Sequence, residues 1–324
     1  MTGRIIEVAQ DGRYLHAERG FLVIKDGQDE VGRIPLDDIA AVIGSGHGLV
    51  LTQEFLVRLA ERNAVYVCCS NRHEPVAMLW SVDGFHRQAG RMDAQLAAPK
   101  PLLKRLWQAV VRAKLTQQAA VLEAWGAPLA PILALIPKVR SGDPDNIEAQ
   151  AARRYWTLLF GESFRRDRTA NDENALLNYG YTILRSATAR AVIGAGLHPT
   201  VPLHHQNQLN SMRLVDDLME PFRPLVDCAV RSLTAMGEKS VNSDTKRQLA
   251  LLLYKDMPSP VGQSSVIQCI ERLCVSLAQV FEGEREQLEF PLTLSALELR
   301  NLVQMETVND LAIGLPHHVD DGDV

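Results

Sequence analysis

A short stretch in the second half of the chain carries an unusual set of polar side chains. The segment 204–224, HHQNQLNSMRLVDDLMEPFRP, contains two histidines, two aspartates, one glutamate and two arginines around a short apolar run. Pro199 and Pro202 lie just before this segment and keep the residues that follow them extended. His204 and His205 are therefore expected on a loop, where a histidine is free to turn toward a ligand.

The acidic residues of this stretch differ in where they should point. Asp217 and Glu220 are three residues apart, so one helical turn would place both on the same face. Pro221 disfavours helical geometry at Glu220, so the turn is expected to be irregular. Asp216 lies about 100° away around the helix and is expected to face solvent or to cap a helix.

One histidine with two or three carboxylates makes an oxygen-rich ligand set. Such a set suits Mg²⁺ or Mn²⁺ better than zinc, which prefers nitrogen and sulfur, or calcium, which prefers oxygen alone. A divalent ion beside arginines is what phosphodiester chemistry requires, because both offset charge on the phosphate. The residues predict a metal-dependent phosphoryl-transfer site, with the polar face of a helix beside a loop as the alternative.

A second cluster could bind the phosphates of a nucleic acid. The net charge is −5, so any nucleic-acid binding must depend on a local patch. The run RRYWTLLFGESFRRDR contains five arginines interleaved with aromatic residues, and arginine donates hydrogen bonds to phosphate in pairs. The alternative is a solvated helix face followed by a basic loop. The four candidates for phosphate contacts are Arg153, Arg154, Arg165 and Arg166.

Composition indicates an ordinary globular protein that we expect in the cytoplasm. Hydrophobic residues make up 46% of the 324 residues, and no apolar run approaches the ~20 residues of a membrane span. The charged N-terminus is unlike a signal peptide. The five cysteines form no CxxC pair, which predicts buried thiols rather than a zinc site.

The pattern of the chain predicts an α+β multidomain protein, with a small N-terminal β-sheet domain followed by a larger all-α catalytic domain. The Asp11-Gly12 and Asp26-Gly27 pairs are hairpin signals, and Thr52 is expected to cap one helix in the β domain. The expected parts are a β-rich domain (1–85), a linker (86–98), a helical domain (99–310) and a frayed polar tail (311–324).

One helix of the second domain carries a further acidic candidate, Glu148. Asp143 and Pro144 are expected to begin this helix and Gly161 to end it. The stripe expected to be buried consists of Ala149, Ala152, Trp156 and Leu159. Glu148 lies beside that stripe, and a lone glutamate in such a place is usually solvated surface.

Four separated motifs, in order, resemble the Cas1 family of CRISPR-associated integrases, most closely the members that accompany type II systems. The motifs are NIEAQAARRYW, NALLNYGYTILRS, GLHPTVPLHHQNQLN and LVDDLMEPFRPLVD. The resemblance implies that Glu148, His205 and Glu220 are catalytic and bind the metal, and that Asp217 is a possible further ligand. It leaves His204 as a neighbour of His205, and Pro202 stands where the family motif has glycine.

The resemblance also implies a function in antiviral defence. Family members are endonucleases and integrases of CRISPR adaptation, which insert short foreign DNA duplexes into the CRISPR array by attack of a 3′-hydroxyl on a phosphodiester. They form homodimers, largely through the β domain. Two such dimers are bridged by one dimer of the small protein Cas2, and this heterohexamer binds the captured duplex and the CRISPR repeat. No membrane takes part.

Two other functions are compatible with the residues. The first is a metal-dependent phosphoesterase that acts on nucleotides or small phosphoesters. The adjacent His-Asp pair of one such helical class is missing, as is a glycine-rich phosphate loop. The second is a non-catalytic binding subunit in which the acidic cluster is only structural. Metal-dependent nicking of DNA by the purified chain would argue against the second.

Overall fold

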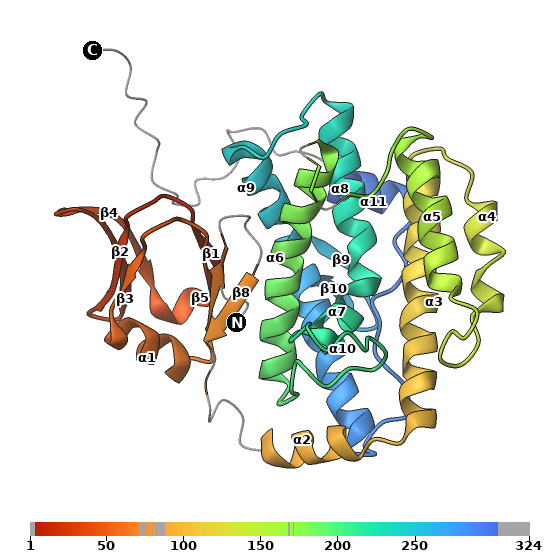
Figure 1. Cartoon of the computed structure of the whole chain (residues 1–324), viewed down its shortest axis with the longest axis horizontal. Coiled ribbons are helices and arrows are strands. Elements are labelled where there is room, and N and C mark those ends of the chain that lie inside the picture. The colour runs from red at the N-terminus through yellow and green to blue at the C-terminus, as the bar shows by residue number, and fades with distance from the viewer. Residues whose placement is uncertain are drawn as a thin grey trace. The chain divides into compact units, whose positions relative to one another are not determined.

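The computed structural model describes residues 4–70, 75–79, 81, 88–167, 169–170 and 172–303. The chain divides into two compact units between residues 82 and 83, close to the boundary expected at residue 85. The first unit contains mostly strands and the second mostly helices (Figure 1). The α+β class with an N-terminal β unit is therefore confirmed. The tail 311–324 lies outside the described residues.

The β unit contains two four-stranded sheets and one helix. The first sheet has the order β1-β5-β7-β8, formed by β1 (Arg4–Val8), β5 (Ile39–Gly44), β7 (Val65–Cys69) and β8 (Pro75–Leu79). The second has the order β4-β3-β2-β6, formed by β4 (Asp29–Pro35), β3 (Phe21–Asp26), β2 (Tyr14–Glu18) and β6 (Val50–Leu51). The short turn η1 (Leu36–Asp38) precedes β5. Buried residues of both sheets form one core, so the unit has a single apolar centre.

Helix α1 (Gln53–Glu61) completes this core, as its sequence predicts. The Thr52 hydroxyl accepts a hydrogen bond from the Phe55 N–H at 3.2 Å, which caps the first turn. Phe55 and Leu59 are buried, and Phe55 packs edge-on against the ring of Tyr66 in β7. Phe55 and Leu59, four residues apart on one face of α1, thus attach this helix to the sheet.

Only one of the two predicted hairpins forms. Asp26-Gly27 joins β3 to β4, which pair in antiparallel register. Asp11-Gly12 instead connects the two sheets, because β1 pairs with β5 and β2 pairs with β3. The β2–β3 hairpin turns at Arg19 and Gly20, whose φ angles of 50° and 85° match the left-handed turn that tight hairpins favour. The dipeptide signal at Asp11-Gly12 does not reveal which strand each neighbour pairs with.

The helical unit is built around one long helix, α3 (Lys100–Ala124), which packs against several of the others. The remaining helices and short turns are α4 (Ala130–Leu133), η2 (Ile136–Lys138), α5 (Ile147–Phe160), α6 (Glu173–Gly194), α7 (Arg213–Met219), η3 (Glu220–Phe222), α8 (Arg223–Ala235), α9 (Ser243–Leu251), η4 (Leu252–Tyr254), α10 (Val266–Phe281) and α11 (Ala296–Leu302). The Cys228, Cys269 and Cys274 thiols are buried among them, and Cys68 and Cys69 of β7 are half-buried. All five are free. Within the described part, no helix is both long and apolar enough to span a bilayer.

Two details of this unit differ from the expected pattern. The stretch 86–98, expected to be a linker, contains helix α2 (Gln88–Ala97), whose Arg91 and Gln95 are buried. Their polar groups bond to Ala195, Glu282 and the 198–201 loop, so the helix buries polar rather than apolar side chains and its sequence resembles a linker. The unit also contains an antiparallel pair, β9 (Asp256–Ser259) and β10 (Gly262–Ser265), so it is not wholly helical. Strands of four residues are too short to show alternation.

Helix α5 begins later and buries a different stripe than expected. Its first residue is Ile147, and the Asp143 carboxylate caps it by accepting the N–H groups of Ile147 and Glu148, each at 2.9 Å. Gly161 ends it with φ of 100°, as predicted. The buried residues are Ile147, Ala151, Tyr155 and Leu159, so only Leu159 of the expected stripe is buried. Trp156 packs instead on Phe160 and Phe164 at the helix end.

Candidate metal centre

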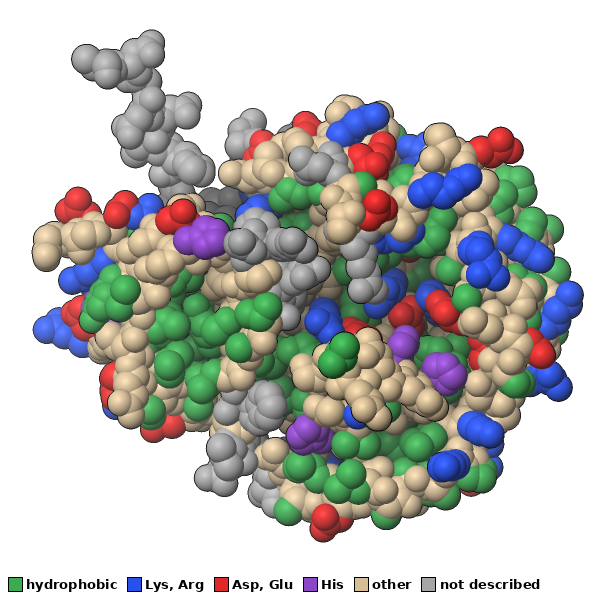
Figure 2. Space-filling view, viewed as in Figure 1, with side chains coloured by type: hydrophobic (Ala, Val, Ile, Leu, Met, Phe, Trp, Pro, Cys, Tyr) green, Lys and Arg blue, Asp and Glu red, His purple; other side chains and the backbone are tan. Residues whose placement is uncertain are grey.

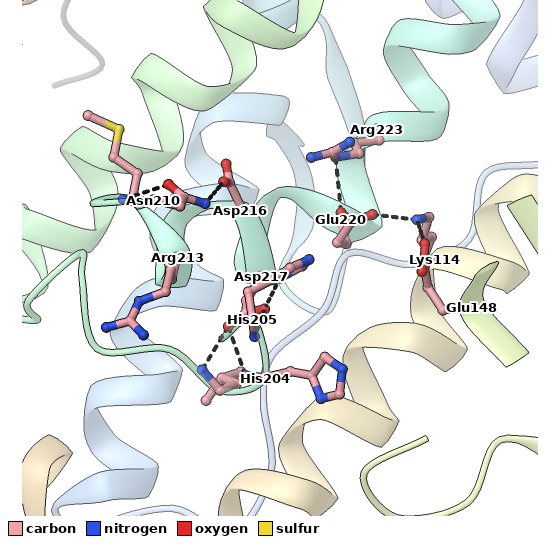
Figure 3. Close-up of polar contacts among 12 residues, drawn as sticks. Lys114, Glu148, His204, His205, Asn210, Arg213, Asp216, Asp217, Glu220 and Arg223 are labelled. Carbon is pink, nitrogen blue, oxygen red and sulfur yellow. Dashed lines mark hydrogen bonds and ion pairs between the residues drawn. The ribbon is translucent and has the colours of Figure 1, made fainter. Parts of the chain in front are cut away.

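Lys114 of α3 brings together two of the predicted acidic residues. Its ammonium contacts Glu148 Oε1 of α5 and lies 2.5 Å from Glu220 Oε2 at the start of η3 (Figure 3). Burial alone would lower the pKa of Lys114, but the negative charges of Glu220 and Glu148 outweigh burial and raise the pKa. Lys114 is therefore a buried cation that two carboxylates share.

Glu220 is buried and ionised. Burial would raise the pKa of its carboxyl, but the positive charges of Arg223 and Lys114 outweigh burial and lower the pKa. Arg223 Nε lies 3.2 Å from Oε1. Among the described residues, Oε2 has no partner in hydrogen-bond geometry, although the Lys114 ammonium is close to it. A buried, ionised carboxylate is a suitable metal ligand, but the Lys114 ammonium already lies beside this oxygen.

Asp217 positions the histidine loop through one buried carboxylate. Its side chain is fully buried and accepts the N–H groups of Leu203 at 2.7 Å and His204 at 3.0 Å. Asp217 Oδ1 also lies 2.5 Å from His205 Nδ1. This hydrogen bond is the largest cause of a raised pKa at His205, and burial opposes it. With Nδ1 bonded to Asp217, His205 has Nε2 left for a ligand, as in metal-binding histidines held by a carboxylate.

Trp107 of α3 distinguishes the two histidines. The His204 ring is stacked on Trp107 with ring centroids 4.5 Å apart and an angle of 1° between the planes. Trp107 meets His205 edge-on at 5.6 Å. Burial lowers the pKa of His204, which keeps it neutral. His204 thus packs against an aromatic face, whereas His205 is the histidine anchored beside Glu220.

Asp216 neither faces solvent nor caps a helix, contrary to the sequence-based expectation. Its carboxylate accepts hydrogen bonds from Arg185 Nε at 2.7 Å and Nη2 at 3.0 Å, and from Asn210 Nδ2 at 2.6 Å. Arg185 belongs to α6 and lies 31 residues away in sequence. The angle around the helix therefore correctly placed Asp216 and Asp217 on different faces. It could not show that Asp216 has a partner on another helix.

The predicted metal ligands form two pairs rather than one closed cluster. Glu148 and Glu220 meet through Lys114, while His205 pairs with Asp217 and feels the negative charge of Glu220. In the part of the chain that the structure describes, no three His, Cys, Asp or Glu side chains converge closely enough to hold a metal ion. The donor set nevertheless fits Mg²⁺ or Mn²⁺, because two carboxylates already face one shared cation and an imidazole lies beside them.

The four arginines expected to bind phosphate fall into different environments. Arg153 and Arg154 are exposed on α5, but at 3.6 residues per turn they lie about 140° and 120° around the helix from Glu148. Arg165 is exposed on the following loop. Arg166 donates to Asn174 and Asn178 and lies over the Tyr181 ring. Basic, acidic and histidine side chains also gather on the face of the helical unit in Figure 2.

Sequence reasoning missed three charged residues around the centre. Lys114 had a usable signal, because it lies on the buried stripe of α3, seven residues after Trp107, where a lysine is rarely placed without a partner. Arg223, one of the two arginines of the segment 204–224, comes three residues after Glu220. Asp227 of α8 accepts a hydrogen bond from the Tyr181 hydroxyl, and burial raises its pKa to about 7. Asp227 lies within the apolar run LVDCAV (225–230), which is a usable signal that this aspartate is buried.

Known proteins with similar sequences are described as CRISPR-associated. A family model described as "CRISPR associated protein Cas1" matches residues 6–257. The CRISPR-associated endonuclease Cas1 of Neisseria meningitidis serogroup C is 34% identical over 303 residues, covering 92% of this chain and 99% of that protein. The chain thus matches that relative over nearly its whole length.

Solved structures share the fold at low sequence identity. A casposase bound to an integration product superposes with a TM-score of 0.76 at 22% identity, covering 90% of this chain and 93% of the casposase. A chain of a Cas6-RT-Cas1–Cas2 complex gives a TM-score of 0.73 at 18% identity, covering 90% of this chain and 36% of that one. At such identities the likeness concerns the fold.

Proposed function

We propose, from the premise that this chain belongs to the Cas1 family of CRISPR-associated proteins, that it is a metal-dependent DNA endonuclease and integrase of CRISPR adaptation. The observation that carries the proposal is the meeting of Glu148 and Glu220 at Lys114, beside the His205–Asp217 pair. The relative from N. meningitidis is named an endonuclease, and the casposase structure contains an integration product. Both names support DNA strand chemistry as the function of this chain.

Glu148, His205 and Glu220 would hold the metal ion, which we propose to be Mg²⁺ or Mn²⁺. When bound, such an ion polarises a phosphate oxygen and lowers the pKa of an attacking hydroxyl. Asp217 acts through His205 by fixing its ring and the adjacent loop. Arg223 keeps Glu220 ionised and adds positive charge beside the place where a phosphate would lie.

The reaction exchanges one phosphodiester bond for another. The 3′-hydroxyl of the captured DNA forms a new bond to a phosphorus atom of the array, while the bond from that phosphorus to its original 3′-oxygen breaks. The proton lost by the attacking hydroxyl balances the proton gained by the released one, and no covalent enzyme intermediate is needed. The chain's part is to orient the two strands and to offset the charge of the phosphate.

The partners follow from the same family. We propose that Arg153, Arg154 and Arg165 bind DNA phosphates away from the centre, since all three are exposed. Arg166, which is held by internal contacts, would reach DNA only by leaving them. We further propose a homodimer through the β unit and an assembly of two such dimers bridged by a Cas2 dimer. A solved complex that contains Cas1 and Cas2 supports that partner.

A strand-transfer assay with branched and supercoiled DNA tests the function. We expect product with Mg²⁺ or Mn²⁺ and none in excess chelator, with Cas2 increasing the yield. Glu148→Ala, His205→Ala and Glu220→Ala should each abolish transfer, whereas the exposed Glu162→Ala should retain it as the matched control. Full transfer by Glu220→Ala would contradict the proposal. Faster turnover on free nucleotides than on DNA would instead favour a phosphoesterase.

A further inference from the structure

The Lys114 ammonium lies between two of the proposed metal ligands. It contacts Glu148 Oε1 and lies 2.5 Å from Glu220 Oε2, and its side chain is only 8% exposed. Figure 3 shows these side chains reaching toward one another from α3, α5 and η3. Both oxygens belong to residues that we propose as metal ligands. A positive charge of the protein therefore already neutralises the carboxylates that the ion needs.

Four charged side chains meet here, two basic and two acidic, and their charges balance without any added ion. Lys114 and Arg223 supply two positive charges, and Glu148 and Glu220 supply two negative charges. A divalent ion added to this balanced group leaves an excess of positive charge in a largely buried region, which is costly. The excess disappears if anions arrive at the same place, and the phosphates of DNA are such anions.

We propose that Lys114 makes metal binding depend on DNA, an inference that rests on the function proposed above. In the DNA-free protein Lys114 competes with the divalent ion for Glu148 and Glu220. When DNA is bound, the ammonium turns to a phosphate and releases the two carboxylates. Lysine suits this exchange because it carries a compact charge on a flexible four-carbon stem.

The exchange couples two binding events. If DNA increases the affinity for the ion, the ion must increase the affinity for DNA by the same factor. The protein without DNA then holds the ion weakly, and the complete centre forms only when a substrate strand is in place. In this scheme Lys114 acts on the ion through the two carboxylates and contacts a phosphate once DNA is bound.

Binding of Mn²⁺ to the full chain tests the proposal directly. Free Mn²⁺ is measured by electron paramagnetic resonance with and without a short duplex whose strands end in 3′-dideoxynucleotides, which lack the attacking hydroxyl. We expect the affinity at the centre to rise about tenfold or more with the duplex, within the usual range of such couplings. Glu220→Ala, titrated in parallel, measures the ions bound by the duplex alone. Equal affinity with and without duplex overturns the proposal.

Substitution of Lys114 gives the second measurement. Lys114→Met removes the charge but keeps the length, and should bind Mn²⁺ about tenfold more tightly than wild type without DNA, with a smaller effect of the duplex. Lys114→Arg keeps the positive charge, so the side chain should still compete with Mn²⁺ for the two carboxylates. Lys104 is exposed on the same helix, and Lys104→Met is the matched control. Weaker Mn²⁺ binding by folded Lys114→Met would show a merely structural role. If that variant does not fold, the wild-type comparison with and without duplex decides.

The two proposals fail in different ways. If no Mn²⁺ site sensitive to Glu220→Ala exists in either state, the proposed metal centre itself is wrong. If such a site exists but its affinity changes neither with duplex nor with Lys114→Met, the centre stands and the role of Lys114 is wrong.

Discussion

The carboxylate of Asp217 is bonded both to the ring of His205, 2.5 Å from Nδ1, and to the backbone N–H of Leu203 at 2.7 Å. One buried side chain therefore fixes the orientation of a candidate ligand and the path of the loop that carries it. Oδ1 bonds to the ring and Oδ2 accepts the backbone N–H groups of Leu203 and His204, so both effects depend on one carboxylate. This relationship explains why a fully buried aspartate lies next to an open polar site.

Asp217→Asn should reduce strand transfer by about tenfold to a hundredfold, the usual cost of losing the partner of a metal-binding histidine. The amide keeps the shape of the carboxylate but lacks its charge and one acceptor atom. Mn²⁺ affinity should fall with activity, and the measurement is a titration of both on the same preparation. Asp244→Asn, on the exposed start of α9, is the control and should change neither. Unchanged Mn²⁺ affinity in Asp217→Asn would refute the role given to Asp217.

The two histidines should respond differently to alanine. His205→Ala removes a proposed ligand and should abolish Mn²⁺ binding at the centre. His204→Ala removes only the stack on Trp107, which should cost about 1 kcal/mol of unfolding free energy, the scale of an aromatic pair, and leave Mn²⁺ bound. Urea unfolding and Mn²⁺ titration separate the two effects. The reverse result would make His204 the ligand.

Asp227 should make stability depend on pH. Burial raises its pKa in the folded protein to about 7, whereas an unfolded aspartate titrates near ~4. Between these values the folded state keeps a proton that the unfolded chain has lost, so the free energy of unfolding falls as pH rises through this window and levels off above it. The contribution is present below about pH 4, lost above about pH 7, and worth about 4 kcal/mol at most.

Asp227→Asn removes that dependence while its amide oxygen can still accept the Tyr181 hydroxyl. The measurement is the unfolding free energy of both proteins in urea from pH 4 to pH 8. The value for the variant minus the value for wild type should increase as pH rises. Parallel curves for the two proteins would show that folding does not raise the pKa of Asp227.

Gly180 should not tolerate a side chain, because α6 and α8 approach closely there. A Cβ at Gly180 would lie 2.5 Å from Cγ1 of buried Val226. Gly180→Ala should therefore lower the unfolding free energy by about 1–3 kcal/mol, as overpacking does. Gly194→Ala, at the end of the same helix with open space around it, should be neutral or slightly stabilising. Urea unfolding of both variants compares them directly, and equal effects would contradict the packing argument.

The sequence predicted the parts of the centre that a short segment determines. Proline and loop composition placed the histidines on a loop, and helical angle distinguished buried Asp217 from Asp216. The resemblance to Cas1 supplied Glu148, which by its own surroundings looked like a surface residue. Lys114 was missed because its meaning depends on two carboxylates from distant segments, and periodicity within one helix cannot show them.

The errors in the fold have the same origin. Asp11-Gly12 has the composition of a hairpin, but strand pairing decides its role, and β1 finds its partner in β5. Helix α2 was taken for a linker because its buried face bonds through Arg91 and Gln95 rather than through apolar contacts. In the first case the local sequence correctly predicted a turn, and in the second it correctly showed a polar segment. Contacts with distant residues decided which structure each segment forms.

The distance in sequence between Lys114, Glu148 and Glu220 has a consequence for synthesis of the protein. Helices α3 and α5 leave the ribosome well before η3, so for some time the growing chain carries Lys114 and only one of its two carboxylate partners. A chain that stops before residue 220 cannot assemble the centre at all. Such truncated chains lack the proposed DNA-cutting centre, so the cell's own chromosome is not exposed to that centre until residue 220 has been made.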